Sequence, residues 1–254
     1  MGLNVKKILI SQPKPAGDKS PYYDIAEKYA VEVVFRPFIK IDPVELKDFR
    51  TQRINILDFS AVVFTAKTGV DHFFRLVGET RVYIPDTMKY FCVTEAIAVY
   101  LQKYIVYRKR KIFFAATGKM EDLATLISKH NKENYLVVVS DVHKNDLLLV
   151  MDAKKIKHKE AVMYRTVSND FAPGESFDYD ALIFFSPSGI NSLMKNFPKF
   201  QQGDVAIGTF GPTTAKAAKD AGLRLDIEAP TPDAPSMTAA LENYLKKALP
   251  KKKK

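Results

Sequence analysis

The chain has 254 residues, of which 46% are hydrophobic, and its 39 basic and 29 acidic residues give a formal net charge of +10. This composition supplies enough apolar side chains for buried cores and excludes a disordered chain. No apolar run reaches the about 20 residues that a membrane helix needs, so we expect no contact with a membrane.

The single cysteine, Cys92, cannot form a disulfide within the chain, and we interpret it as a buried structural thiol. The N-terminus reaches charged residues without the apolar stretch of a signal peptide. Both features predict a cytoplasmic location.

The excess of positive charge favours a polyanionic partner. Lys251–Lys254 contribute four of these charges, and we interpret this tail as a solvated charge run. Nucleic acid is the usual partner of such a chain, and a small molecule with many carboxylates is a less usual one. The other basic residues are spread along the chain and form no stripe with aromatic residues, so the pattern gives only weak support for a nucleic acid.

The chain begins with the usual start of a parallel α/β sheet, a strand, a helix and a second strand. We predict them over Lys6–Ser11, Pro21–Tyr29 and Val31–Phe38. Residues 37–42 then suit an extended linker, since prolines flank them.

The central part alternates strands with helices. The predicted strands are Ala61–Phe64, Tyr90–Val93, Ile112–Phe114 and Leu136–Ser140, and the predicted helices are Val70–Val77, Ala96–Tyr104, Lys119–His130 and Asp146–Lys154. Residues 163–168 are extended again and are predicted to be a return linker.

After this linker the pattern restarts. Strands are predicted over Ala181–Phe185, Val205–Gly208 and Leu223–Ile227, and helices over Ile190–Asn196, residues 211–222 and Ser236–Leu249. The segments Asp58–Val70 and Asp178–Ile190 align without a gap, which indicates two similar α/β units. The N-terminal strand has no counterpart before the second copy, so we assign it to the sheet of that copy.

The predicted fold class is therefore α/β, with two similar domains joined by two extended linker strands. Each domain is a parallel sheet flanked by helices. The first domain is discontinuous and comprises residues 1–37 and 168–254, while residues 42–163 form the second. We expect the ligand site in the cleft between them.

Ligands of open α/β sheets bind beyond the carboxyl ends of the strands. The turns at these ends are rich in hydroxyls and in backbone amides at helix N-termini, which bind carboxylate or phosphate without a metal. For each single serine or threonine, the alternative is a role only as an N-cap.

Several other chemistries are excluded. His72, His130, His143 and His158 have no metal-ligand spacing. Thr117-Gly118-Lys119 lacks the upstream glycines of a phosphate-binding loop. Neither a dinucleotide-binding fingerprint nor a nucleophile elbow is present.

Ordered motifs in the second half resemble those of the uroporphyrinogen-III synthase family. They are Met163–Thr166, Phe184–Gly189, Ala206–Gly208, Gly211–Ala215 and Ala229–Pro232. Between the third and fourth motifs, Thr209-Phe210 is a two-residue insertion. In the first half, Phe64-Thr65-Ala66 resembles the family's Phe-Thr-Ser.

The resemblance implies two α/β domains joined by two strands, and cyclisation of hydroxymethylbilane to uroporphyrinogen III. The last pyrrole ring is inverted and water is lost in this reaction, which is a step of haem biosynthesis. The family uses no metal or organic cofactor. The substrate is a linear tetrapyrrole polycarboxylate, and we expect a monomer that receives it transiently from hydroxymethylbilane synthase.

By the same resemblance, Tyr164 is the candidate catalytic residue, assisting departure of the hydroxyl. The alternative is a linker tyrosine that packs one domain against the other. The candidate substrate-binding residues are Thr65, Thr68, Thr94, Ser186, Ser188, Gly189, Thr213 and Thr214. Because Ala66 replaces a serine and Thr94 is displaced, the alternative function is a non-catalytic ligand-binding or regulatory protein of the same fold.

Overall fold

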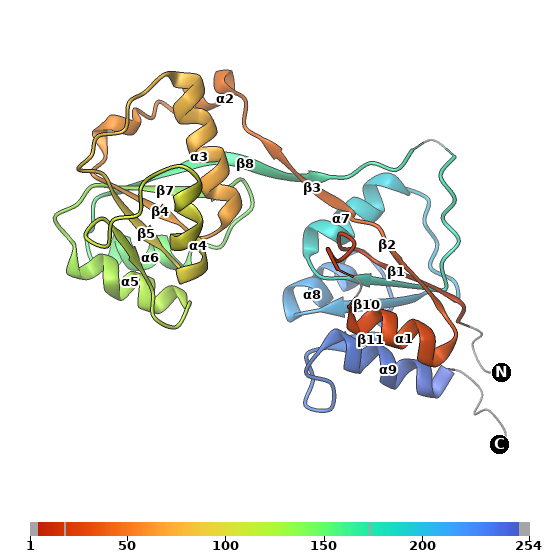
Figure 1. Ribbon diagram of the computed structural model, residues 1–254. Helices are drawn as coiled ribbons and strands as arrows, with labels where there is room; N and C mark the ends of the chain where they lie inside the picture. Colours follow the sequence, from red (N-terminus) through yellow and green to blue (C-terminus); the bar gives the residue numbers. More distant parts are fainter. Residues whose placement is uncertain (1–4, 18, 173, 249–254) are drawn as a thin grey trace. The chain divides into compact units, whose positions relative to one another are not determined.

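The computed structural model describes residues 5–17, 19–172 and 174–248, and the predicted lysine tail lies outside them. The chain forms two compact units. The terminal unit comprises Met1–Lys40 and Val167–Lys254, and the central unit comprises Ile41–Thr166. Figure 1 traces the chain through both. No helix among the described residues is long and apolar enough to cross a membrane.

The terminal unit contains a five-stranded parallel sheet with the order β11-β10-β9-β1-β2. Its strands are β1 (Lys7–Ile10), β2 (Glu32–Phe35), β9 (Ala181–Phe184), β10 (Ala206–Phe210) and β11 (Ile227–Ala229). Strand β1 pairs with β9, which confirms its assignment to the sheet of the second copy. The Asp180 carboxylate fixes this pairing, because it accepts hydrogen bonds from the backbone amides of Lys6 and Lys7 at 2.7 and 2.8 Å.

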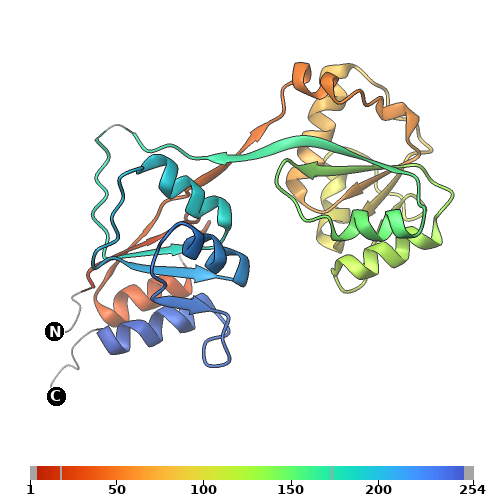
Figure 2. The same cartoon turned by 180° about the vertical axis from the view of Figure 1, so that it is seen from behind.

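Helices cover both faces of this sheet, because the side chains along each strand point alternately into two cores. Ile8 and Ile10 pack with the helices α1 (Pro21–Tyr29) and α9 (Met237–Ala248), which lie side by side in Figures 1 and 2. Leu9 faces the opposite core, with α7 (Pro187–Asn196) and α8 (Pro212–Asp220). Burial on both faces explains why the strands read as continuous apolar runs.

The central unit contains a six-stranded sheet with the order β3-β8-β7-β4-β5-β6. The strands are β3 (Ile39–Pro43), β4 (Ala61–Phe64), β5 (Lys89–Cys92), β6 (Ile112–Phe114), β7 (Tyr135–Ser140) and β8 (His158–Ser168). The helices are α2 (Leu46–Thr51), α3 (Lys67–Thr80), α4 (Glu95–Tyr100), α5 (Met120–Lys129) and α6 (Asp146–Ala153). Strand β4 pairs in parallel with β5 and β7.

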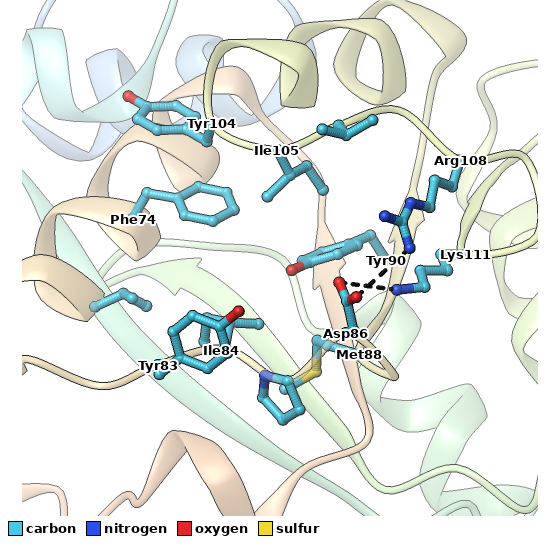
Figure 3. Close-up of a pocket in the computed structure, with 13 residues that line it drawn as sticks. Phe74, Tyr83, Ile84, Asp86, Met88, Tyr90, Tyr104, Ile105, Arg108 and Lys111 are labelled. Carbon is cyan, nitrogen blue, oxygen red and sulfur yellow. Dashed lines mark hydrogen bonds and ion pairs between the residues drawn. The ribbon is translucent and has the colours of Figure 1, made fainter.

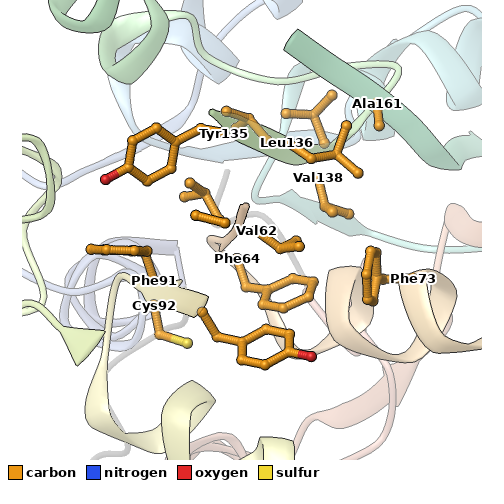
Figure 4. Packing of buried hydrophobic residues seen from close by; sticks show 14 of the residues in the cluster. Val62, Phe64, Phe73, Phe91, Cys92, Tyr135, Leu136, Val138 and Ala161 are labelled. Atoms are coloured by element: carbon orange, nitrogen blue, oxygen red, sulfur yellow. The ribbon is translucent and has the colours of Figure 1, made fainter. Parts of the chain in front are cut away.

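The core of the central unit is built from both faces of this sheet (Figure 4). Phe64 and Phe91 are fully buried, as is Tyr135. Cys92 lies among them, and burial raises the pKa of its thiol to about 12. It is therefore the buried thiol that the sequence predicts.

The residues of both predicted linkers lie largely in strands of this sheet, β3 and β8. The return segment is the end of β8, which pairs in parallel with β7 and has a register shift between Val139 and Ser140. The Gln52 side chain also mimics a strand partner, since it accepts a hydrogen bond from the Val162 amide at 2.9 Å and donates to its carbonyl at 2.7 Å. Such satisfied backbone groups hold the segment in the sheet.

Three further elements differ from the prediction. Helix α2 was not predicted, because its six residues are too few to show a period. The helix predicted over Ala96–Tyr104 ends as α4 at Tyr100, and Leu101–Lys103 form a 3₁₀ turn. Strand β11 begins only at Ile227, the last residue of the predicted strand Leu223–Ile227. The residues before it form a loop, which Asp226 holds beside β10 by accepting a hydrogen bond from the Ile207 amide at 3.0 Å.

Candidate active site

In the terminal unit, the turn between β9 and α7 carries three of the predicted residues. Ser186 is the N-cap of α7 and accepts a hydrogen bond from the Gly189 amide at 3.2 Å. Ser188 is half-buried in the first turn of the helix. A Cβ at Gly189 would lie 3.2 Å from Phe184 Cδ1, so the close approach of turn and strand favours glycine.

The next turn leads from β10 into α8, and Thr213 and Thr214 lie in the first turn of this helix. Thr213 is exposed, whereas Thr214 is only 1% exposed. Gly211 precedes the helix with a φ of +87°, a conformation that suits glycine, and no side chain caps the helix. Backbone amides in this first turn are therefore available to an anion.

Thr209 lies beside this turn and was not among the predicted residues. It is fully buried in β10, and its Oγ1 has no hydrogen-bond partner among the described residues. It lines a cavity of about 250 Å³ together with Gly211, Pro212, Ala215, Glu228, Ala229, Pro230 and Thr231. The signal in the sequence is a hydroxyl residue at the end of an apolar strand, inside the two-residue insertion.

In the central unit, Thr65 follows β4 and Thr68 lies in the first turn of α3, and both are half-buried. Ala66 is the N-cap of α3 and offers no side-chain hydrogen bond. The replacement of serine by alanine therefore leaves the first turn of α3 without a side-chain cap, and its amides can bind an anion.

Thr94 occupies the corresponding position before α4. Its side chain is the N-cap of this helix and accepts a hydrogen bond from the Ile97 amide at 3.3 Å. A Cβ at Gly118, whose φ is +72°, would lie 3.3 Å from Thr94 Cγ2. The geometry of Thr94 fits the N-cap alternative, which the sequence leaves open.

Tyr164 lies in β8, opposite Ser140 of β7, and is 8% exposed. Burial raises the pKa of its phenol, and neither a hydrogen bond nor a charged group among the described residues contributes to the shift. The phenol therefore stays protonated at neutral pH and keeps a hydrogen to donate.

His72 stacks on Tyr164, with ring centroids 5.5 Å apart and planes at 17°. Its partner Arg75 donates from Nε to His72 Nδ1 at 3.4 Å and is itself held by the Val44 carbonyl at 2.7 Å. Desolvation and the charge of Arg75 lower the pKa of His72, so the imidazole is neutral and carries its proton on Nε2. The sequence motifs do not reveal the stacking of His72 on Tyr164, since the sequence singles out His72 only as a histidine without metal-ligand spacing.

The structure thus brings together Tyr164, His72 and the first turn of α3 within the central unit. A Cβ at Gly69 would lie 3.8 Å from Tyr164 Cε1 and 3.4 Å from Val138 Cγ1, so the small residue lets the tyrosine lie close to the helix. Among the described residues, no group of three or more His, Cys, Asp or Glu side chains could hold a metal ion.

The chain is similar to known proteins both in sequence and in fold. The family model described as uroporphyrinogen-III synthase HemD matches residues 21–239. A curated relative, uroporphyrinogen-III synthase of Saccharomyces cerevisiae, is 26% identical over 140 residues, which are 49% of this chain and 50% of that protein. The matched part thus spans about half the length of this relative.

Two solved structures share the fold. Uroporphyrinogen-III synthetase from Helicobacter pylori is 19% identical with a TM-score of 0.59 and covers 95% of this chain and 99% of its own. A mutant uroporphyrinogen III synthase from Thermus thermophilus is 14% identical with a TM-score of 0.54, with the same two coverages. Because the family model extends over most of the chain, the chain belongs to the uroporphyrinogen-III synthase family.

Proposed function

We propose that this chain cyclises hydroxymethylbilane to uroporphyrinogen III, with inversion of the last pyrrole ring and loss of water. The observation that carries the proposal is the family match over residues 21–239. A buried Tyr164, protonated and with a hydroxyl that no described residue engages, supports it.

The substrate is a linear tetrapyrrole with eight carboxylates, and two features of the chain suit it. The first is the formal net charge of +10, which attracts a polyanion. The second is the set of helix N-termini after β4 and β10, where α3 and α8 have no side-chain cap. We propose that Thr65 and Thr68 bind substrate carboxylates at the N-terminus of α3, and that Thr213 does so at the N-terminus of α8.

Ser186, Ser188 and Gly189 form the corresponding site before α7. Ser186 is both the N-cap and a hydroxyl donor, so it can bind a carboxylate while its lone pair accepts from Gly189. Thr94 and Thr214 contribute mainly through the backbone in this proposal, because one caps α4 and the other is buried.

The reaction needs a proton at the departing hydroxyl. We propose that Tyr164 donates it, so that the carbon–oxygen bond breaks, water leaves and the pyrrole nitrogen stabilises the cation as an azafulvene. The substituted carbon of the last ring then attacks this cation and forms a spiro intermediate. Its fragmentation and reclosure invert the ring, and loss of a proton restores the aromatic pyrrole.

The spontaneous closure of hydroxymethylbilane gives the uninverted type I isomer. The protein must therefore hold the substrate so that the substituted carbon reaches the cation first, and positioning supplies most of the selectivity. We also propose that the chain works as a cytoplasmic monomer and takes its substrate directly from hydroxymethylbilane synthase, because a short transit limits spontaneous closure. Its single cysteine fits a reducing compartment.

A coupled assay tests the proposed activity. Hydroxymethylbilane is supplied with and without the chain, and the oxidised products are separated into types I and III. We expect mainly type III with the chain and type I without it. Type I alone in both samples would refute the activity and would favour a non-catalytic ligand-binding protein of the same fold.

A further inference from the structure

A pocket of the central unit lies away from the candidate site residues described above. It has a volume of about 350 Å³ and is shown in Figure 3. It is lined by Phe74, Val77, Tyr83, Ile84, Pro85, Asp86, Met88, Tyr90, Tyr104, Ile105, Val106, Arg108 and Lys111.

This pocket lies at the amino ends of two strands. Met88 directly precedes β5 and Lys111 directly precedes β6, whereas Thr94 follows the carboxyl end of β5. Four residues of strand, about 13 Å at the usual rise, therefore separate the two edges of the sheet. The pocket is not part of the proposed substrate site.

One wall of the pocket is aromatic, while Asp86, Arg108 and Lys111 make other parts of its lining polar. Phe74 and Tyr104 stack with centroids 4.5 Å apart and planes at 9°, and Tyr90 lies 6.4 Å from Phe74. The Tyr104 hydroxyl donates to Asp71, and Lys103 donates to the same carboxylate at 2.8 Å. A rigid aromatic wall of this kind binds without the entropic cost of ordering side chains.

The rim of the pocket exposes apolar side chains. Tyr83 is 86% exposed and Val106 is 77% exposed, the two largest values among the large hydrophobic residues that the structure describes. Both line this one pocket. Exposed apolar groups gathered around a hollow are typical of surfaces that bind another protein.

A run of four cations, Arg108–Lys111, borders the same rim. Asp86 faces two of them, at 3.6 Å from Arg108 and 3.4 Å from Lys111, and its side chain is 82% exposed. Lys109 and Arg110 are exposed and have no ion pair with any other described residue. The rim therefore keeps a positive charge that complements an acidic partner.

We propose that this pocket binds an acidic segment of a partner protein, which inserts one large apolar side chain between Tyr83 and Tyr104 and sets its carboxylates against Arg108–Lys111. The volume lies at the low end of the about 300–1,000 Å³ range of ligand pockets, which suits one anchoring side chain.

A single-stranded nucleic acid would fit these observations less well. Bases bind by stacking on free aromatic faces, and Phe74 and Tyr104 stack on each other.

The test uses the full chain and fluorescein-labelled synthetic peptides of twelve residues, read by fluorescence anisotropy. Each peptide has six Asp or Glu residues around a central Phe, Leu or Ala. We expect the Phe or Leu peptide to bind at least about tenfold more tightly than the Ala peptide. Binding should weaken with salt.

Variants locate the binding. The double variant Lys109→Glu/Arg110→Glu should weaken binding of the Phe peptide by about tenfold or more. The control Lys129→Glu/Lys132→Glu changes exposed lysines of the same unit and should alter the affinity less than about twofold. Tyr83→Ser should reduce the preference for Phe over Ala. All variants should cyclise free hydroxymethylbilane at the wild-type rate, so this proposal and the proposed activity fail separately.

Three outcomes would overturn the proposal. They are no peptide binding at millimolar concentration, equal binding of the Phe and Ala peptides, and equal weakening by the two charge-reversal variants. Tighter binding of a single-stranded RNA with the same number of charges would assign the surface to nucleic acid instead.

Discussion

The imidazole of His72 lies nearly parallel to the ring of Tyr164, 17° from parallel with centroids 5.5 Å apart. The two residues come from α3 and β8, which are distant in sequence. Arg75 fixes the histidine from one side, so the stack holds the orientation of the phenol while its hydroxyl stays open. His72 is thus a positioning residue for Tyr164 in the proposed reaction.

Tyr164→Phe tests the proton donor. The variant keeps the ring and its stack on His72, so its thermal midpoint should match the wild type within a few degrees. The turnover of hydroxymethylbilane should fall by about a hundredfold, the range that a positioned general acid contributes. A wild-type rate of type III formation would remove Tyr164 from the mechanism.

The variant His72→Phe keeps an aromatic ring beside Tyr164 but removes the titratable imidazole. The folded pKa of His72 lies below its ordinary value of 6.5, so the unfolded chain binds the proton first as the pH falls. This group therefore costs the wild type stability below about pH 6.5, and none above it. Between pH 7.5 and pH 5, the urea midpoint of the wild type should therefore fall relative to that of the variant.

Both proteins carry the other histidines, so the effect of their titration cancels in the difference between the two urea midpoints. If the difference stayed constant with pH, the imidazole would not be held neutral by burial and Arg75. The activity of the variant adds a second readout, since a phenylalanine that still orients Tyr164 should retain most of the turnover, whereas His72→Ala should lose more.

The fold follows from local patterns that the sequence displays directly. The aligned copies Asp58–Val70 and Asp178–Ile190 correspond to β4 with the start of α3 and to β9 with the start of α7. Strands buried on both faces need apolar runs, and helix N-termini favour Ser, Thr or Gly, so both features can be recognised in the sequence.

The features that escaped prediction depend on contacts between distant residues. Asp71 accepts hydrogen bonds from Tyr100, Lys103 and Tyr104, and this shared carboxylate accompanies the change from α4 to a 3₁₀ turn. The stack of His72 on Tyr164 likewise requires the register of β8 on β7. No periodicity or motif encodes either relationship.

Glycines give a matched pair of stability tests. A Cβ at Gly208 would lie 2.5 Å from Ile183 Cδ1 and 3.3 Å from Ile227 Cβ, so Gly208→Ala should destabilise the chain by about 1–3 kcal/mol through overpacking. Gly78 lies in α3, where an added methyl group would have no described atom within 4 Å, and Gly78→Ala should stabilise the chain by up to about 1 kcal/mol. Denaturant unfolding measures both, and equal effects would contradict the packing in the sheet.

Thr209→Val tests the buried hydroxyl beside α8. Its Oγ1 is fully buried without a partner among the described residues, so the isosteric valine should leave stability unchanged or raise it by about 1 kcal/mol. If the hydroxyl donates to a substrate carboxylate in the neighbouring cavity, KM should rise by about tenfold while kcat changes little, because the contact is made before and during the reaction. Thr213→Val is the control, since its exposed hydroxyl should affect KM without any gain in stability. A loss of stability in Thr209→Val would mean that the hydroxyl has a structural partner, and an unchanged KM would place Thr209 outside the substrate site.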